Sequence, residues 1–213
     1  KKKKIAIIGL SCLFPDAPTI EQFWNNLIEK KGSTSPATQA QMGIDPELFY
    51  DGKNGKAVEP GKYYCKRGGY INGFQFNPTG YHLSPELLTG LDRIYQWSLY
   101  VAQQALQDSQ HLGKVEALAS CGVILGSLSI PTQRSHQLVA SIYKQSIDLA
   151  LQKLLQQPQF DLPSLNSSKE ISEINRLGSG YLSTLVAQGL GLSGVNFTFD
   201  AACASSIFAI QLA

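Results

Sequence analysis

The stretch VNFTFDAACASSIFAIQLA, residues 195–213, joins a strand pattern to a helix pattern around one cysteine. Val195–Asp200 alternates apolar and polar side chains, which is the period of a β-strand. The residues from Cys203 onward are compatible with a helix. The neighbours of Cys203 are all small: Ala201, Ala202, Ala204, Ser205 and Ser206. A crowded turn requires such neighbours, so the stretch predicts a strand-to-helix turn that carries Cys203.

Two interpretations of Cys203 are open from the residues alone. At the N-terminus of a helix, unpaired backbone N–H groups and the helix dipole favour the thiolate over the thiol. The same N–H groups can hold the oxyanion that forms when a thioester is attacked. The alternative is that a free cysteine among alanines is a small buried hydrophobic residue.

A cysteine nucleophile needs a base or a proton-transfer partner, which is usually histidine. The chain contains three histidines, His82, His111 and His136, and no motif links any of them to Cys203. The sequence therefore presents a nucleophile without a visible partner.

The rest of the chain alternates strand and helix patterns, which indicates an α/β layered fold. Two apolar runs predict buried strands: Ile5–Gly9 and Ala119–Gly126. Periodicity predicts helices over residues 18–28, 92–110, 136–157 and 174–190. The first of these helices places Phe23, Trp24, Leu27 and Ile28 on one face. A further helix is predicted to start with Ser84 as its N-cap and Pro85 as its first residue. Residues 32–82 are predicted to be long loops with short elements, and residues 158–170 a linker.

The predicted helix over residues 92–110 is the clearest of these. Its repeating positions are Ile94, Trp97, Ser98, Val101, Ala105 and Leu106. The predicted helix over 174–190 ends at Gly191 or Gly194.

Composition excludes several classes of function. The chain has 213 residues, of which 43% are hydrophobic. Its net charge is only +2, so no strong attraction to nucleic acid is expected. We interpret the basic run Lys1–Lys4 as a solvated segment. The four cysteines form no CxxC pair and have no histidine at ligand spacing, which argues against a metal site. No segment approaches the roughly 20 apolar residues of a membrane span, and no signal peptide is visible, so we expect a cytoplasmic protein with reduced thiols.

The residues after the first apolar run argue against a dinucleotide-binding loop. Such a loop needs glycines two and five residues after Gly9, and these positions hold Ser11 and Phe14.

Three blocks of sequence resemble one known family. They are Ile5-Ala-Ile-Ile-Gly-Leu-Ser-Cys-Leu-Phe-Pro15 with Phe23-Trp24, Cys121-Gly-Val-Ile-Leu-Gly126, and Asp200-Ala-Ala-Cys-Ala-Ser-Ser206 preceded by Asn175-Arg176 and Gly191-Leu-Ser-Gly194. Over essentially its whole length the chain resembles the N-terminal part of β-ketoacyl synthases, the ketosynthase domains of polyketide and polyunsaturated-fatty-acid synthases. It departs from many members at Ala201 and Ala204, where they have Thr and Ser, and at Leu91-Asp92-Arg93, where Asp-Pro-Gln is usual.

The resemblance implies a thiolase-like layered α/β fold, of which residues 1–213 are the N-terminal half only, with the domain continuing beyond residue 213. It implies that Cys203 is the catalytic residue and takes an acyl chain from the phosphopantetheine of an acyl carrier protein. Two histidines and a lysine from the second half would then assist decarboxylation of a malonyl unit, whose carbanion attacks the acyl-cysteine. This accounts for the missing base, and we expect residues 1–213 alone to be inactive in condensation.

The same resemblance implies a homodimer, an acyl carrier protein as partner, no directly bound cofactor and no metal. Two other functions remain as alternatives. One is a non-catalytic ketosynthase-like module for dimerisation or chain-length control, against which the presence of Cys203 argues. The other is a cysteine hydrolase of α/β-hydrolase type, which would have glycine two residues on either side of the nucleophile, where Ala201 and Ser205 stand.

Overall fold

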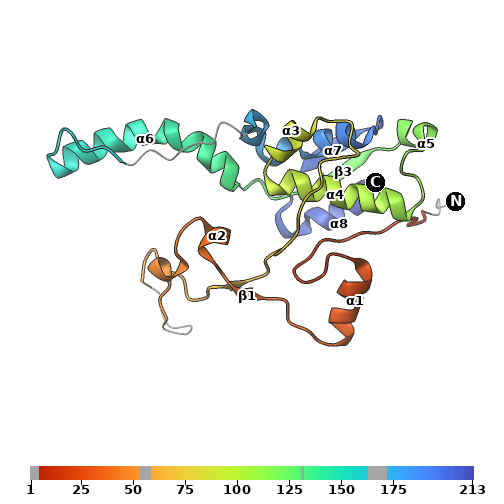
Figure 1. Cartoon of the computed structure of the whole chain (residues 1–213), viewed down its shortest axis with the longest axis horizontal. Helices are drawn as coiled ribbons and strands as arrows, with labels where there is room; N and C mark the ends of the chain where they lie inside the picture. The colour runs from red at the N-terminus through yellow and green to blue at the C-terminus, as the bar shows by residue number, and fades with distance from the viewer. Residues whose placement is uncertain (1–4, 53–58, 131, 163–171) are drawn as a thin grey trace. The chain divides into compact units, whose positions relative to one another are not determined.

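The computed structural model describes residues 5–52, 59–130, 132–162 and 172–213. The chain divides into two compact units, Lys1–Gln75 and Phe76–Ala213 (Figure 1). The Lys1–Lys4 run and most of the predicted linker, residues 163–170, lie outside the described residues.

The first unit consists of short elements joined by loops, as predicted for residues 32–82. Its elements are α1 (Ile20–Ile28), β1 (Ser35–Pro36), α2 (Gln39–Met42), the 3-10 helix η1 (Pro46–Phe49) and β2 (Arg67–Gly68). Strands β1 and β2 pair antiparallel, with Ser35 opposite Gly68.

Helix α1 confirms the predicted amphipathic helix but does not bury its apolar face. The Thr19 hydroxyl caps the helix by accepting a hydrogen bond from the Gln22 N–H at 3.2 Å. Trp24, Leu27 and Ile28 are 60%, 54% and 65% exposed, whereas the buried residue of the helix is Asn26.

The predicted strand at Ile5–Gly9 is wrong. Within the described residues this segment has no strand partner, and Ile5 and Ile7 are 87% and 79% exposed. An apolar run is stable as a strand only when neighbouring strands accept its backbone hydrogen bonds and both faces are covered. No described strand of the chain does so here.

The second unit contains the longer helices and a parallel strand pair. Its elements are α3 (Pro85–Thr89), α4 (Arg93–Asp108), α5 (Val115–Ala119), β3 (Val123–Gly126), α6 (Gln133–Leu155), the 3-10 helix η2 (Glu173–Tyr181), α7 (Leu182–Leu190), β4 (Asn196–Phe199), the 3-10 helix η3 (Ala202–Ala204) and α8 (Ser205–Leu212). The short helix α5 was not predicted. What was predicted as one helix over 174–190 is η2 and α7, with a kink inside η2 where Gly178 has φ 54° and ψ −146°.

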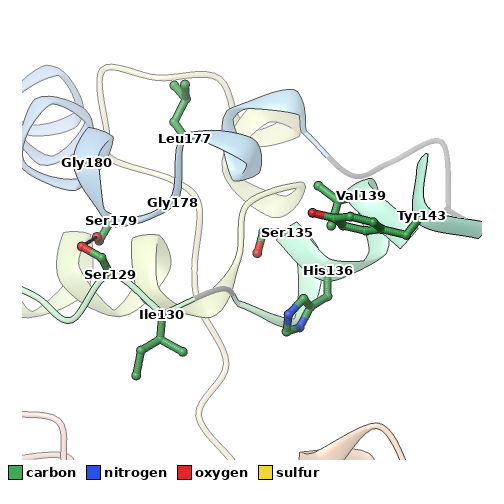
Figure 2. A pocket seen from close by; sticks show the side chains of 10 residues that line it. All are labelled: Ser129, Ile130, Ser135, His136, Val139, Tyr143, Leu177, Gly178, Ser179 and Gly180. Atoms are coloured by element: carbon green, nitrogen blue, oxygen red, sulfur yellow. Dashed lines mark hydrogen bonds between the residues drawn. The ribbon is translucent and has the colours of Figure 1, made fainter. Parts of the chain in front are cut away.

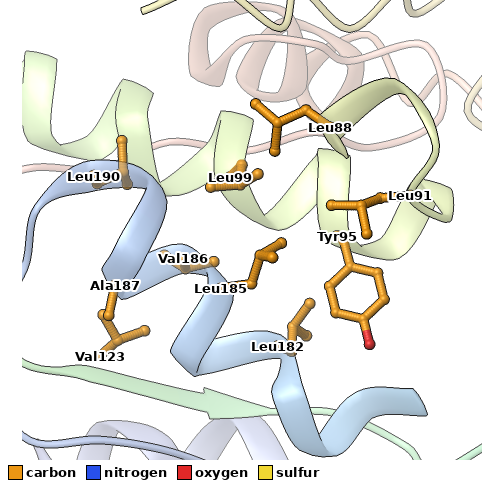
Figure 3. Close-up of a cluster of buried hydrophobic side chains, with 10 residues drawn as sticks. All are labelled: Leu88, Leu91, Tyr95, Leu99, Val123, Leu182, Leu185, Val186, Ala187 and Leu190. Carbon is orange, nitrogen blue, oxygen red and sulfur yellow. The ribbon is translucent and has the colours of Figure 1, made fainter. Parts of the chain in front are cut away.

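Layers of helix and strand build this unit. Figure 3 shows α7 lying between α4 and β3, and α8 also packs against β3. The buried apolar side chains come from α3, α4, α7, β3 and the loop before α4, and they are Leu88, Leu91, Tyr95, Leu99, Val123, Leu182, Leu185, Val186, Ala187 and Leu190. We call this set the α4–α7 core. Gly189 permits the close approach of the two helices, because a Cβ there would lie 2.6 Å from Leu99 Cδ2.

Helix α4 begins through contacts with distant residues. The Asp92 side chain makes no hydrogen bond to its own helix, and its Oδ2 instead accepts the Arg134 N–H of α6 at 3.0 Å. The buried Asn175 side chain accepts the Asp92 N–H at 2.7 Å and donates to the Gly90 carbonyl at 2.9 Å. This helix start is where the chain departs from the family's usual Asp-Pro-Gln, and here Asn175 secures it.

The face of α4 that meets the α4–α7 core includes two of the predicted positions, because Ile94 and Leu106 pack against this core partly buried. Tyr95 and Leu99 are the fully buried side chains of the helix, and neither was among the predicted positions. The Tyr95 hydroxyl donates to the carbonyl oxygen of Gly178. Burial, followed by the nearby charge of Asp92, raises the pKa of Tyr95 to about 12, so this hydroxyl remains a donor at neutral pH.

Strands β3 and β4 pair in parallel, from Val123 opposite Asn196 to Gly126 opposite Phe199. Glycines allow close approach around the pair. A Cβ on Gly122 would lie 2.6 Å from the Val195 carbonyl oxygen, and one on Gly126 would lie 2.7 Å from the backbone of Ser205. The carboxyl ends of both strands therefore lie at one edge, directly against the first residue of α8.

In the described part of the chain, none of the helices combines the length and the apolar character that crossing a membrane requires.

Candidate active site

Cys203 lies in the turn between β4 and α8, as the sequence predicts. The turn contains η3, one turn of 3-10 helix, and Cys203 is its middle residue. Its thiol is free and exposed, which argues against the alternative of a small buried hydrophobic residue.

The residue before Cys203 has a strained backbone. Ala202 adopts φ 49°, in the left-handed region that residues other than glycine rarely occupy. Such a conformation costs about 1 kcal/mol for a residue with a Cβ, and it persists only where the surroundings impose it. The strained residue directly precedes the exposed Cys203 in this turn.

Hydrogen bonds from one serine close the turn. The buried Ser205 hydroxyl donates to the Ala202 carbonyl at 2.8 Å and accepts the Ala201 N–H at 2.9 Å. The Ala204 N–H donates to the Ala201 carbonyl at 3.1 Å. The first residue of α8 thus fixes the backbone on both sides of the strained Ala202.

A carboxylate connects this turn to the loop after β3. Asp200 Oδ1 accepts the Ala202 N–H at 2.8 Å, and Asp200 Oδ2 accepts the Ser129 N–H at 2.8 Å. The backbone hydrogen bond from Ser129, followed by that from Ala202, lowers the pKa of Asp200 below its ordinary value. The carboxylate is therefore ionised at neutral pH.

A pocket of about 450 Å³ lies next to this loop (Figure 2). Its lining residues are Ser129, Ile130, Ser135, His136, Val139, Tyr143, Leu177, Gly178, Ser179 and Gly180. They come from the loop after β3, from α6 and from the kink in η2, and the Ser129 and Ser179 hydroxyls are 3.3 Å apart. Cys203 does not line the pocket, but Asp200 joins its turn to the rim residue Ser129.

The three histidines lie at different places. The ring of His82 covers Gly191, the left-handed residue that ends α7, and a Cβ there would lie 2.7 Å from His82 Cε1. His111 Nδ1 donates to the Ser109 carbonyl at 2.7 Å. His136 lines the pocket. Within the described residues no hydrogen bond joins a histidine to Cys203.

Two residues of the site were not predicted from the sequence. Asp200 belongs to one of the motif blocks but had no predicted role, and Ser129 was not singled out. Their contact joins positions 71 residues apart. A polar residue at the carboxyl end of each of two adjacent parallel strands is the pattern that could have found them.

Comparisons with family models and with curated proteins identify the same family. The model of the β-ketoacyl synthase N-terminal domain matches residues 2–213. Among curated proteins, one polyunsaturated fatty acid synthase subunit of Thraustochytrium sp. (strain ATCC 26185 / S-3) is 26% identical over 217 residues, covering 99% of this chain and 8% of the relative. A second subunit of the polyunsaturated fatty acid synthase of that organism is 24% identical over 216 residues. The match covers 100% of this chain and 9% of that relative. The chain therefore spans less than a tenth of the length of these relatives.

Solved structures agree in fold. The chain is 42% identical to the PfaC keto synthase–chain length factor, with a TM-score of 0.85, covering 97% of this chain and 22% of that one. The oxazolomycin ketosynthase domain OzmH KS7 of Streptomyces albus JA3453 is 22% identical, with a TM-score of 0.66. The match covers 97% of this chain and 30% of that one. The second likeness shows the fold alone. The predicted thiolase-like α/β fold is confirmed, and the chain belongs to the β-ketoacyl synthase family, whose N-terminal domain its residues 2–213 match.

Proposed function

We propose that this chain is the acyl-accepting part of a condensing enzyme in which Cys203 carries the growing acyl chain. The observation that carries the proposal is the exposed thiol of Cys203 in the turn between β4 and α8, next to Ala202 with its left-handed backbone. A turn of this kind presents a side chain to a substrate and leaves space around it, and the small neighbours of Cys203 keep that space open.

The proposed reaction has two stages. First, the Cys203 sulfur attacks the carbonyl carbon of an acyl thioester, and the pantetheine thiol leaves with a proton as the new thioester forms. Second, a malonyl thioester loses carbon dioxide, and the resulting carbanion attacks the acyl-cysteine carbonyl. This forms a carbon–carbon bond and breaks the bond between the acyl carbon and the sulfur, so Cys203 leaves as a free thiolate and the β-ketoacyl product stays on the carrier thioester. In the family, the residues that assist the second stage lie in the second half of the domain.

Partners and substrates follow from this reaction. We propose that an acyl carrier protein delivers both thioesters on its phosphopantetheine, that the enzyme binds no other cofactor or metal directly, and that it acts in the cytoplasm as a homodimer. The pocket beside Ser129 is a place for part of the substrate, because both hydroxyl groups and apolar side chains line it.

Chain-length control is the second candidate. The PfaC structure carries both functions in its name, keto synthase and chain length factor. A module that only limits chain length needs no acyl-cysteine, so the two functions differ in whether Cys203 becomes acylated.

The test is acylation of the full-length protein by a radiolabelled acyl thioester, with tryptic mapping of the label. We expect the label on the peptide that contains Cys203, and its complete loss in Cys203→Ala. Cys65→Ala is the matched control, because Cys65 is also a free, exposed cysteine and should leave labelling unchanged. A wild-type protein that carries no label on Cys203 would contradict the proposal and favour chain-length control.

A further inference from the structure

We propose that Asp200 is a positioning residue, which fixes the direction of the Cys203 side chain relative to the rim of the pocket at Ser129. The inference rests on the proposed function, since it gives Asp200 a role only if Cys203 is the acylated residue.

The first support is the geometry of the carboxylate. Its two oxygens bind two different loops, one through the Ala202 N–H and one through the Ser129 N–H, each at 2.8 Å. Ala202 directly precedes the nucleophile, and Ser129 lines the pocket. One side chain therefore sets the separation between the turn that carries the sulfur and the loop that borders the pocket.

The second support is the strained backbone of Ala202. A left-handed alanine relaxes unless its neighbours impose the conformation. The Ser205 hydroxyl accepts the Ala201 N–H and donates to the Ala202 carbonyl, whereas the Ala202 N–H is bound by Asp200. Without Asp200, the Ala202 N–H loses its hydrogen-bond acceptor. Rotation about the backbone bonds of Ala202 would then change the direction of the Cα–Cβ bond of Cys203.

The third support is the match between the carboxylate and its two donors. An ionised carboxylate accepts hydrogen bonds on both oxygens, whereas an amide accepts on one atom only. The interactions that lower the pKa of Asp200 are hydrogen bonds from Ser129 and Ala202 and not the charge of a basic side chain. Two N–H donors from two loops thus require aspartate rather than asparagine.

A graded pair of variants tests the proposal in the full-length protein. Asp200→Asn keeps one acceptor oxygen and turns an NH₂ group toward the second N–H donor, so it loosens one of the two loops. Asp200→Ala removes both hydrogen bonds, the one to the Ala202 N–H and the one to the Ser129 N–H. Glu116→Gln is the control, because it removes an exposed carboxylate from α5.

Two rate constants are measured for each protein: acyl transfer to Cys203 at saturating acyl thioester, and alkylation of Cys203 by iodoacetamide. Acyl transfer requires an oriented sulfur, and misplacement of a reacting group by about 1 Å can lower a rate roughly 100-fold. Alkylation by a small reagent requires only an exposed thiol. We expect acyl transfer to fall about 10-fold in Asp200→Asn and about 100-fold in Asp200→Ala. Alkylation should change less than about threefold, because the thiol stays exposed in both variants.

The outcomes separate the two proposals. If wild type is labelled on Cys203 but the Asp200 variants transfer acyl groups at the wild-type rate, the role of Asp200 is overturned and the proposed function stands. Equal losses of acyl transfer and alkylation also overturn it, because they indicate a general change at the thiol. If wild type is not labelled on Cys203, both proposals fail. Should Asp200→Ala not fold, Asp200→Asn alone decides by the same two rates.

Discussion

The α4–α7 core and the Cys203 turn lie in the same unit but are stabilised by different interactions. The core consists of apolar side chains such as Leu99 and Leu185, which are fully buried. The turn has an exposed cysteine and a strained alanine, and it is closed by hydrogen bonds from Ser205 and Asp200. The core is stabilised by the apolar area that it removes from water, whereas the turn depends on a few directed contacts.

Stability and reactivity can therefore be changed separately in this unit. Truncating a core side chain removes packing and leaves the hydrogen bonds of the turn in place. Altering a turn residue removes little buried area but moves the sulfur. The following changes test this separation, in order of decreasing change in stability.

Leu99→Ala should lower the free energy of unfolding by about 3 kcal/mol, since it deletes a fully buried side chain between α4 and α7. Urea denaturation measures the loss. Leu154→Ala is the control, because Leu154 is 77% exposed and its truncation should change the stability by less than about 0.5 kcal/mol. Similar losses in both variants would break the distinction between core and surface.

Gly126→Ala should cost about 2 kcal/mol and also slow acyl transfer, because the new Cβ would lie 2.7 Å from the backbone of Ser205 and push α8 away from β3. Denaturation and acyl-transfer kinetics report the two effects. Gly32→Ala has no atom within 4 Å of its Cβ and serves as the control. Unchanged acyl transfer in a destabilised Gly126→Ala protein would show that the turn tolerates movement of α8.

Ser205→Ala should cost about 1 kcal/mol, since the Ala201 N–H and the Ala202 carbonyl lose the hydroxyl that joins them. The loss is expected in the urea midpoint, with a larger relative fall in acyl transfer than Leu99→Ala gives. The neighbouring Ser206 is exposed, and Ser206→Ala should match wild type in both measurements.

Ala202→Gly should raise the free energy of unfolding by about 0.5 kcal/mol, because glycine adopts φ 49° without a Cβ clash and this gain exceeds its entropy cost. Ala204→Gly is the matched control. Ala204 has φ −89°, so glycine there brings only the entropy cost and should destabilise. Thermal unfolding of the pair checks the opposite signs, and the same sign in both would contradict strain at Ala202.

The smallest effect concerns pH. The pKa of Asp200 is lowered in the folded protein, so its contribution to stability is present above the ordinary value of 3.8 and is lost as pH falls through the lowered pKa. The difference in urea midpoint between wild type and Asp200→Asn should therefore be present at pH 7 and shrink below pH 3.8. A difference that grows with acidity would mean that the pKa is raised instead.

Local patterns predicted most of the elements of the second unit. Helix α4, the cap at Ser84, strand β3 and the strand-to-helix turn at Cys203 all follow from residues close together in sequence. The full burial of Tyr95 in α4 could not be predicted in this way, because its hydroxyl group bonds the carbonyl of Gly178, 83 residues later. The contact between Asp200 and Ser129 was missed for the same reason. The Ile5–Gly9 run shows the converse, since apolar composition alone does not provide a strand with partners.

The parallel register of β3 and β4 has a consequence for protein engineering. The chain leaves β3 at Gly126 and returns to β4 at Asn196, and the pairing of these strands, together with the glycine contacts, fixes both ends of this excursion. None of the side chains of the α4–α7 core comes from α6, which lies in this excursion, so the sequence of α6 can differ while the two attachment points keep their separation. Chimeras that exchange α6, Gln133–Leu155, between related synthases should retain the nucleophile turn and inherit the pocket side chains that α6 of the donor supplies.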